Sequence, residues 1–143
     1  MNESKLDVKK KAVIEIAENL FLSQGLATTE MKEIARCASI SRSTLYRMFD
    51  SRETLAFAVA DKCLHELFDP KPMEIYGTDR SGFEILRSYS SNLIETMIQG
   101  VRYVKYLSEF DQMFSGDYPD TPEARKYVQF NRQRHDRQIL LNI

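Results

Sequence analysis

The sequence contains little glycine or proline and no long apolar segment. Five glycines and four prolines in 143 residues leave room for long helices, because these two residue types are the ones that most often interrupt a helix. No apolar run approaches the length of a membrane span, and the polar start Met-Asn-Glu-Ser-Lys lacks the apolar core of a signal peptide. We therefore expect a cytoplasmic protein that does not enter a membrane.

Motifs of common enzyme and metal sites are absent as well. The sequence has no glycine-rich phosphate loop, no nucleophile elbow and no paired-histidine motif; His65 and His135 are far apart, without a second ligand at metal-binding spacing. Cys37 and Cys63 fall within helical patterns, and without an export signal we expect free, buried thiols and no disulfide. The sequence thus predicts no catalytic residue, no metal site and no cofactor, and we do not expect an enzyme.

An excess of charge of one sign is missing overall but present locally. The formal net charge is −1, yet the segment from Arg36 to Arg52 holds four arginines and one acidic residue. Lys9, Lys10 and Lys11 form a second basic cluster near the start. Because clustered positive charge attracts the phosphates of nucleic acid, we expect these residues to share one face. For the lysines, a solvated helix start is an equally good interpretation.

The segment from Met31 to Leu55 has the pattern of two short helices joined by a tight turn, with a third helix after them. The first helix carries an apolar stripe at i, i+3, i+4 and i+7, formed by Met31, Ile34, Ala35 and Ala38. Ser41 is placed to cap the second helix and Ser51 to cap the third, which begins at Arg52. Such spacing is typical of a helix-turn-helix.

The second of these helices has the side chains that a DNA-contacting helix needs. Leu45 and Phe49 are expected to face inward, and the outer side carries Arg42, Ser43, Thr44, Tyr46 and Arg47. Arginine donates two hydrogen bonds to guanine, serine and threonine bond to several base edges, and a tyrosine hydroxyl suits a phosphate. The alternative is an ordinary three-helix core whose basic face is only solvated.

The same segment resembles the DNA-binding signature of the tetracycline-repressor (TetR) family. The matching residues are Ile34-Ala35, Ala38-Ser39-Ile40-Ser41, Thr44-Leu45-Tyr46, Phe49, Ser51-Arg52-Glu53 and Leu55, with Ala17, Phe21, Gly25 and Thr29 upstream. Three positions depart from the signature: Ser39 replaces the turn glycine, Met48 the second aromatic residue and Arg52 the lysine. Ser39 is expected to strain the turn if that position needs a positive φ, and Met48 lacks the aromatic ring that would make one expected contact to the DNA backbone.

The resemblance implies an all-α fold with an N-terminal three-helix bundle containing the helix-turn-helix (1–51) and a helical regulatory body (52–143). Arg42, Ser43 and Thr44 would then contact bases, whereas Thr29, Tyr46, Arg47 and Arg52 would hold phosphates. Apart from a phosphate contact, Thr28 or Thr29 is expected to cap the second helix.

The remaining helices follow from periodicity and from glycine and proline. We expect a first helix over 8–24, ended by Gly25, and a helix from Arg52 to Phe68 followed by a loop over 69–79. Further helices are expected over 81–99, 101–114 and from Thr121, a helix-capping residue, to the end.

Bulky side chains in the body define the candidate ligand pocket: Tyr89, Met97, Tyr103, Tyr106 and Phe110. They suit an apolar or aromatic small-molecule effector, although residue by residue ordinary core packing is the better explanation. Family members usually continue for two more helices that form the dimer interface, so we expect these helices to be missing after the apolar stretch 139–143, or another surface to pair the chains.

Two functions are compatible with these observations. The first is a ligand-responsive repressor that binds a palindromic operator in double-stranded DNA as a homodimer. The alternative is an all-helical protein-interaction module without specific DNA binding. Steep loss of affinity with added salt would mark the first, because DNA binding releases counterions.

Overall fold

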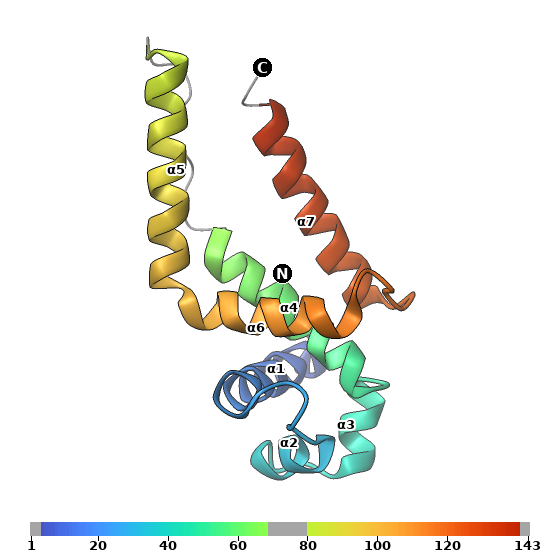
Figure 1. The fold of residues 1–143 in the computed structure, drawn as a ribbon. Helices are drawn as coiled ribbons and strands as arrows, with labels where there is room; N and C mark the ends of the chain where they lie inside the picture. The colour runs from blue at the N-terminus through green and yellow to red at the C-terminus, as the bar shows by residue number, and fades with distance from the viewer. Residues whose placement is uncertain (1–3, 69–79, 141–143) are drawn as a thin grey trace.

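The structure, a computed structural model, describes residues 4–68 and 80–140, with side chains up to Arg134. Over these residues the chain forms α-helices and no strand, which confirms the all-α fold class (Figure 1). The helices are α1 (Lys5–Gln24), α2 (Met31–Cys37), α3 (Arg42–Met48), α4 (Arg52–Phe68), α5 (Gly82–Gln99), α6 (Val101–Phe114) and α7 (Pro122–Leu140). The loop expected over 69–79 and the side chains of the apolar stretch 139–143 lie outside the described residues.

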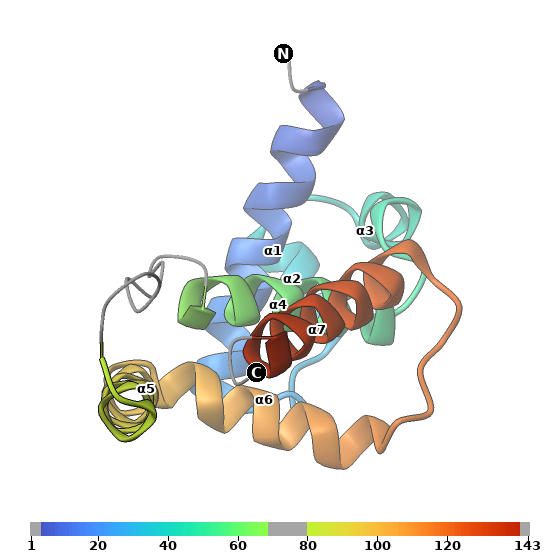
Figure 2. The same ribbon diagram turned by 90° about the horizontal axis from the view of Figure 1, so that it is seen from above.

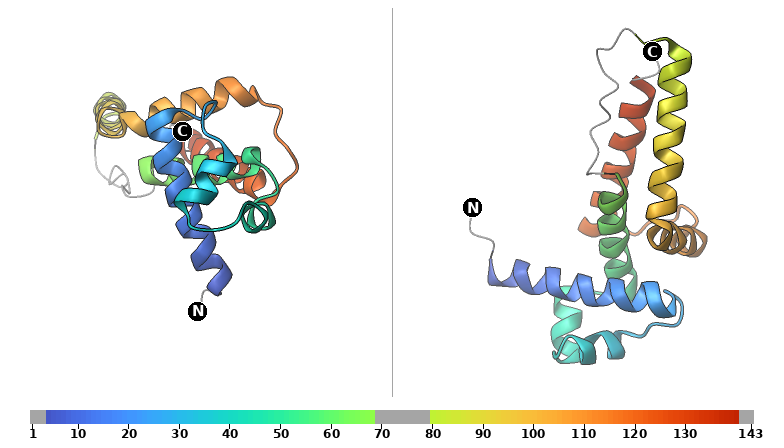
Figure 3. Two further views of the ribbon diagram at one scale, coloured as in Figure 1. Left: turned by 90° about the horizontal axis from the view of Figure 1, so that it is seen from below. Right: turned by 90° about the vertical axis from the view of Figure 1, so that its left-hand side faces the viewer.

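The helices form two layers that α4 connects. Helices α1, α2 and α3, called here the N-terminal bundle, lie together at one end of the molecule (Figure 1). Helix α4 leaves this bundle, and α6 crosses α4 next to the bundle (Figure 1). Helices α5 and α7 extend away from the bundle in roughly the same direction (Figure 3). We call α4 to α7 the body. Seen from above, α1 projects beyond the other helices at its N-terminal end (Figure 2).

Capping residues set the helix starts. Ser4 and Asp7 form a capping box, so α1 begins at Lys5 and not at Val8 as the apolar stripe predicted. Ser81 and Glu84 form a second capping box at α5. A polar residue at such a position satisfies an amide that the first helical turn leaves unpaired, and the stripe alone does not reveal how far the helix extends toward it.

One hydrophobic core runs through both layers. It begins between α1, α2 and α3, continues along the buried side of α4, and ends at α6 and α7. In the body, the Phe57 ring packs edge-on against Phe110 and Tyr127, with ring centroids 4.7 and 5.8 Å apart. Leu45 and Leu55, on either side of the predicted boundary at residue 51, are both fully buried in this core. The two predicted domains therefore share one interior.

A buried charge cluster joins α1 to the body. The Glu18 carboxylate on α1 is only 3% exposed and pairs with Lys62 of α4 and, at 3.8 Å, with Arg102 of α6. Burial alone would lower the pKa of Lys62, but the hydrogen bond and negative charge of Glu18 outweigh it and raise that pKa. A buried carboxylate is tolerated here because two cations compensate it.

Helix α5 is the least covered element. None of its described residues is buried, and it exposes a stripe of apolar side chains that includes Phe83, Leu86, Ile94 and Ile98. Its end is fixed at Gly100, where a Cβ would come within 2.2 Å of the Leu67 side chain of α4. Among the described residues, no helix is both long enough and apolar enough to cross a membrane.

Candidate nucleic-acid interface

The turn between α2 and α3 depends on a left-handed residue. Ser39 has φ +54°, and the next amide, that of Ile40, donates to the Ala35 carbonyl at 3.0 Å. This conformation closes α2 and turns the chain sharply toward α3. The position thus has the positive φ on which the expected strain depends, and a residue with a Cβ occupies a backbone conformation that glycine adopts at lower cost.

Ser41 then starts α3 with a compact hydroxyl network. Its Oγ accepts a hydrogen bond from the Thr44 amide at 3.1 Å, which confirms the predicted cap. The same oxygen lies 2.7 Å from the Thr44 hydroxyl and 3.0 Å from the Ser43 hydroxyl. These contacts fix both candidate base-contacting hydroxyls at the first turn of α3.

The inner face of α3 is apolar and fully packed. Leu45 is completely buried, Phe49 just after the helix is 2% exposed, and Met48 is 9% exposed. Met48, which replaces an aromatic residue of the family signature, therefore contributes to the core of the N-terminal bundle. This packing holds α3 in one rotational setting, which determines the side chains it presents to solvent.

The outer face of α3 gathers five of the candidate residues. Arg42, Ser43 and Arg47 are exposed, the Tyr46 side chain is 42% exposed, and Thr44 is half-buried. A seven-residue helix makes about two turns, so these side chains lie within a single short surface. Two arginines, a phenol and two hydroxyls on one exposed surface form a good set of hydrogen-bond donors for bases and phosphates.

Thr29 has a different position from the one predicted. The residue is completely buried, and its hydroxyl donates to the Gly25 carbonyl at 2.7 Å. Thr28 likewise donates to the Gln24 carbonyl, and α2 begins after Glu30 without any side-chain cap. The prediction that a threonine caps α2 is therefore wrong, and Thr29 has no exposed surface with which to contact a phosphate.

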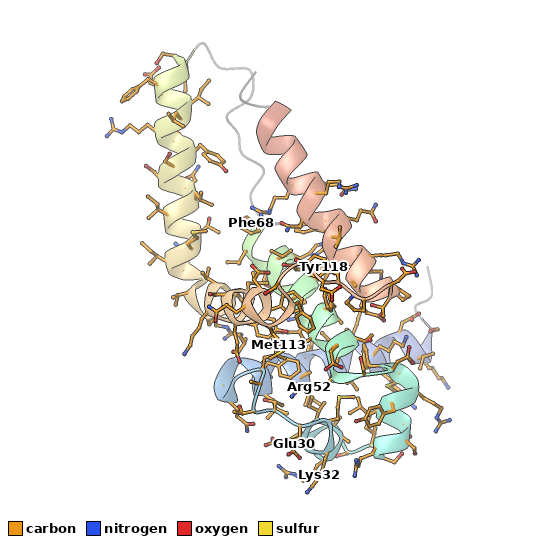
Figure 4. All side chains as sticks on the ribbon, turned by 45° about the vertical axis from the view of Figure 1, so that its right-hand side comes forward. Glu30, Lys32, Arg52, Phe68, Met113 and Tyr118 are labelled. Atoms are coloured by element: carbon orange, nitrogen blue, oxygen red, sulfur yellow. The ribbon has the colours of Figure 1, made fainter. Side chains whose placement is uncertain are left out.

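Arg52 is also less available for a phosphate contact than the sequence suggested. It lies between Met113 of α6 and Glu30 before α2 in the view of Figure 4. The residue is half-buried, and its guanidinium donates to the Ala27 carbonyl at 3.3 Å. In this arrangement Arg52 ties the start of α4 to the turn between α1 and α2.

Additional basic residues border this surface. The Lys10 ammonium lies 5.9 Å from the centre of the Phe49 ring, which places the basic start of α1 beside the end of α3. Lys32 and Arg36 are exposed on α2, and Figure 4 shows Lys32 at the outer end of the bundle. Lys32 was missed from the sequence, although its i, i+4 spacing to Arg36 places both on one side of α2.

The five pocket candidates do not share one environment. Tyr106 and Phe110 are core residues: the Tyr106 hydroxyl donates to the Ala56 carbonyl at 2.9 Å, and burial raises its pKa well above the usual value. Tyr103 is half-buried against Arg102, Tyr89 is half-buried on α5, and Met97 is 43% exposed. Tyr106 and Phe110 are therefore packed in the hydrophobic core, in agreement with the interpretation of these residues as ordinary core packing. In the described part of the chain, no cluster of His, Cys, Asp or Glu is suited to a metal ion.

The N-terminal part of the chain is similar to known bacterial transcriptional regulators. Residues 13–59 match the family model of bacterial regulatory proteins of the tetR family. A segment of 46 residues, 32% of this chain, is 50% identical to an uncharacterized HTH-type transcriptional regulator of Mycobacterium tuberculosis and covers 23% of that protein. A 60-residue segment, 42% of the chain, is 33% identical to the HTH-type transcriptional repressor KstR2 of Rhodococcus jostii and covers 29% of it.

Two longer matches extend beyond the N-terminal bundle. The HTH-type transcriptional regulator YuxN of Bacillus subtilis is 29% identical over 139 residues, which cover 94% of this chain and 45% of that protein. A crystal structure assigned to the tetR family, from Shewanella sp. PV-4, superposes with a TM-score of 0.51 at 20% identity over 85% of this chain and 61% of the other. At that identity the likeness concerns the fold. The chain spans less than half the length of these curated relatives.

Proposed function

We propose, from the premise that this chain belongs to the tetR family of bacterial regulatory proteins, that α3 binds a specific operator in double-stranded DNA. The observation that supports this proposal is that α3 has one buried apolar face and one exposed polar face. Its inner residues are locked in the core, while Arg42, Ser43, Tyr46 and Arg47 are exposed together. An α-helix presented in this way fits the major groove, where base edges can be distinguished.

The roles of the exposed residues follow from their position along α3. Arg42 and Ser43 are in the first turn of α3, the part of a recognition helix that contacts base edges. Tyr46 and Arg47 are one turn further on, where a phenol and a guanidinium can hold phosphates. Lys10 and Lys32, at the borders of this surface, add sequence-independent attraction to the DNA backbone.

The proposal extends to assembly and regulation. A homodimer would present two copies of α3 to the two halves of a palindromic operator, with a spacing of one helical turn of DNA. The body would respond to an apolar or aromatic small molecule. The relative named a transcriptional repressor supports repression as the mode of action. Sizing of the complex with a palindromic duplex tests the dimer, which predicts two chains per duplex.

The central experiment is fluorescence anisotropy with the duplex upstream of the gene and with random duplex, at two salt concentrations. The protein is expected to bind its operator on the order of a thousandfold more tightly than random duplex. Arg42→Ala should reduce operator affinity by on the order of tenfold to a hundredfold and relax specificity at one position. Tyr46→Phe should weaken binding to every duplex by a similar factor, because it removes a phosphate contact.

Arg125→Ala is the matched control. Arg125 is an exposed arginine on α7 that pairs with Asp120 at 3.3 Å, and its loss changes the net charge by the same amount. If Arg125→Ala and Arg42→Ala reduce binding equally, general charge attraction explains the affinity and the proposed role of α3 is wrong. If no duplex is preferred at any salt concentration, the protein-interaction alternative is favoured.

A further inference from the structure

The turn between α1 and α2 is held by two helices that lie outside the N-terminal bundle. The Ala27 amide donates to the Glu109 carboxylate of α6 at 3.1 Å, across 82 residues of sequence. The Ala27 carbonyl accepts from Arg52, the first residue of α4, at 3.3 Å. Both backbone polar groups of this one residue are thus bonded to the body.

Glu109 lies close to this turn, and the backbone conformation of the turn favours a glycine. Gly25 has φ +97°, and a Cβ at this position would lie 3.4 Å from a Glu109 carboxylate oxygen. The adjacent Leu26 is 1% exposed and anchors the turn in the core. The carboxylate therefore lies directly against a turn whose shape is fixed by a glycine on one side and a buried side chain on the other.

The position of α2 depends on this turn because α2 has no cap of its own. The residue before it, Glu30, makes no side-chain capping hydrogen bond. The hydroxyls of Thr28 and Thr29 are used within the turn, on the carbonyls of Gln24 and Gly25. Helix α2 packs in turn against α3, so the orientation of α2 bears on the surface that would contact DNA.

Helix α6 is itself fixed one turn before Glu109. The Tyr106 ring stacks on Phe21 at the end of α1, with centroids 5.9 Å apart, and its hydroxyl bonds to the Ala56 carbonyl of α4. Glu109 and Tyr106 are three residues apart and lie on one side of α6. This side of α6 thereby contacts the last turn of α1, the following turn and α4 together.

We propose that Glu109 is a positioning residue for DNA binding: through the Ala27 amide it sets the orientation of α2 and α3 without contacting DNA. The inference rests on the proposed binding of DNA by α3. An N–H to carboxylate hydrogen bond is charge-assisted and stronger than a neutral one, so its loss has a measurable effect at the helix it holds. Through the same hydrogen bond, a shift of α6 in the body would move the turn before α2 and so alter the N-terminal bundle.

The test compares three variants in operator binding. Glu109→Leu removes the acceptor and should weaken operator binding about tenfold, or about 1.4 kcal/mol. Its slope of log affinity against log salt should remain that of the wild type, because no phosphate contact is lost. Glu109→Gln keeps an acceptor oxygen and should bind within about twofold of the wild type.

Glu95→Leu is the charge-matched control. Glu95 is exposed on α5 and accepts a hydrogen bond from Gln99, so its replacement removes the same negative charge far from the turn. It should not weaken DNA binding. Amide hydrogen exchange provides an independent readout, since the Ala27 amide should exchange faster in Glu109→Leu than in the wild type, Glu109→Gln or Glu95→Leu.

The outcomes separate this inference from the proposed function. If the wild type prefers its operator and Glu109→Leu binds as tightly as Glu95→Leu, the positioning role is refuted while DNA binding stands. If Glu109→Gln loses as much affinity as Glu109→Leu, the hydrogen bond is not what matters and the inference is also refuted. If the wild type shows no operator preference, the proposed function fails and this inference fails with it, whatever the exchange rate of Ala27.

Discussion

Replacing Ser39 with glycine should stabilise the protein, because the backbone at this position is already in the conformation that glycine prefers. Ser39 has φ +54° and an exposed side chain in the turn between α2 and α3. The substitution removes a Cβ that crowds the backbone in the left-handed region. Because the side chain is exposed, little packing is lost with it.

The expected gain is the difference between two opposing effects. A residue with a Cβ in the left-handed conformation is disfavoured by about 1–2 kcal/mol. Glycine loses about 0.5–1 kcal/mol more conformational entropy on folding than alanine. The midpoints of these two ranges give a net gain in the free energy of unfolding of about 0.75 kcal/mol. For a chain of this size that corresponds to a rise in melting temperature of about 1–4 °C.

Urea denaturation followed by circular dichroism measures this gain, with Ser39→Ala as the control that keeps the Cβ. The midpoint should rise for Ser39→Gly and not for Ser39→Ala, with an unchanged denaturant slope. Ser115, at the end of α6, has φ +42° but donates a hydrogen bond to the Gln112 carbonyl, so Ser115→Gly should gain less. Equal stability of Ser39→Gly and Ser39→Ala would refute the argument that the left-handed conformation strains this turn.

Three further outcomes follow from burial and backbone geometry. Gly25→Ala should lower the free energy of unfolding by about 1–2 kcal/mol in urea denaturation, because φ at this position is +97°, a backbone conformation that a residue with a Cβ rarely adopts. Burial raises the pKa of Asp61, only partly offset by the neighbouring histidine. Ionised Asp61 therefore destabilises the fold, and Asp61→Asn should be more stable than wild type at pH 7, with a gain that is lost in pH-dependent melting curves as the pH falls through the raised pKa of Asp61 toward its ordinary value. A thiol reagent at pH 8 should label one cysteine of the native chain, the exposed Cys37, and two in denaturant, because Cys63 is buried and burial raises its pKa to about 12.

The sequence predicted the helices well because their signals are local. Helix α4 has the predicted bounds, and Ser51 caps it by accepting a hydrogen bond from the Thr54 amide at 3.1 Å. The burial of Leu45 and the exposure of Arg42 and Arg47 follow from helical periodicity, which needs only nearby residues. These features account for most of the surface proposed to bind DNA.

Features that depend on distant contacts could not be predicted in this way. Thr28 and Thr29 look like capping residues in the sequence, but their hydroxyls bond back to carbonyls of the preceding turn. Arg52 suggested a phosphate contact, yet its guanidinium bonds to Ala27, 25 residues earlier in the chain. No pattern in the sequence pairs Ala27 with Glu109, because only the path of α6 across the bundle brings them together.

The cysteines and the pocket candidates illustrate the same limit. Cys37 was expected to be buried, but it is exposed, because it is the last residue of a short helix whose apolar stripe turns away from it. Tyr106 and Phe110 are spaced like the other pocket candidates on helices of the body. Only the crossing of α6 over α1 and α4 determines that these two fill the core.

The continuous core through α4 has a consequence for how such a protein can be recombined. Leu55 and Val59 are completely buried and belong to the same interior as Leu45 and Phe21 of the N-terminal bundle. A chimaera joined at residue 51 would replace half of that interior with side chains selected in another protein. A graft that carries α4 along with the bundle keeps those contacts and moves the mismatch to the α4 surface facing α6 and α7. The smallest transferable unit of this protein is therefore a bundle of four helices.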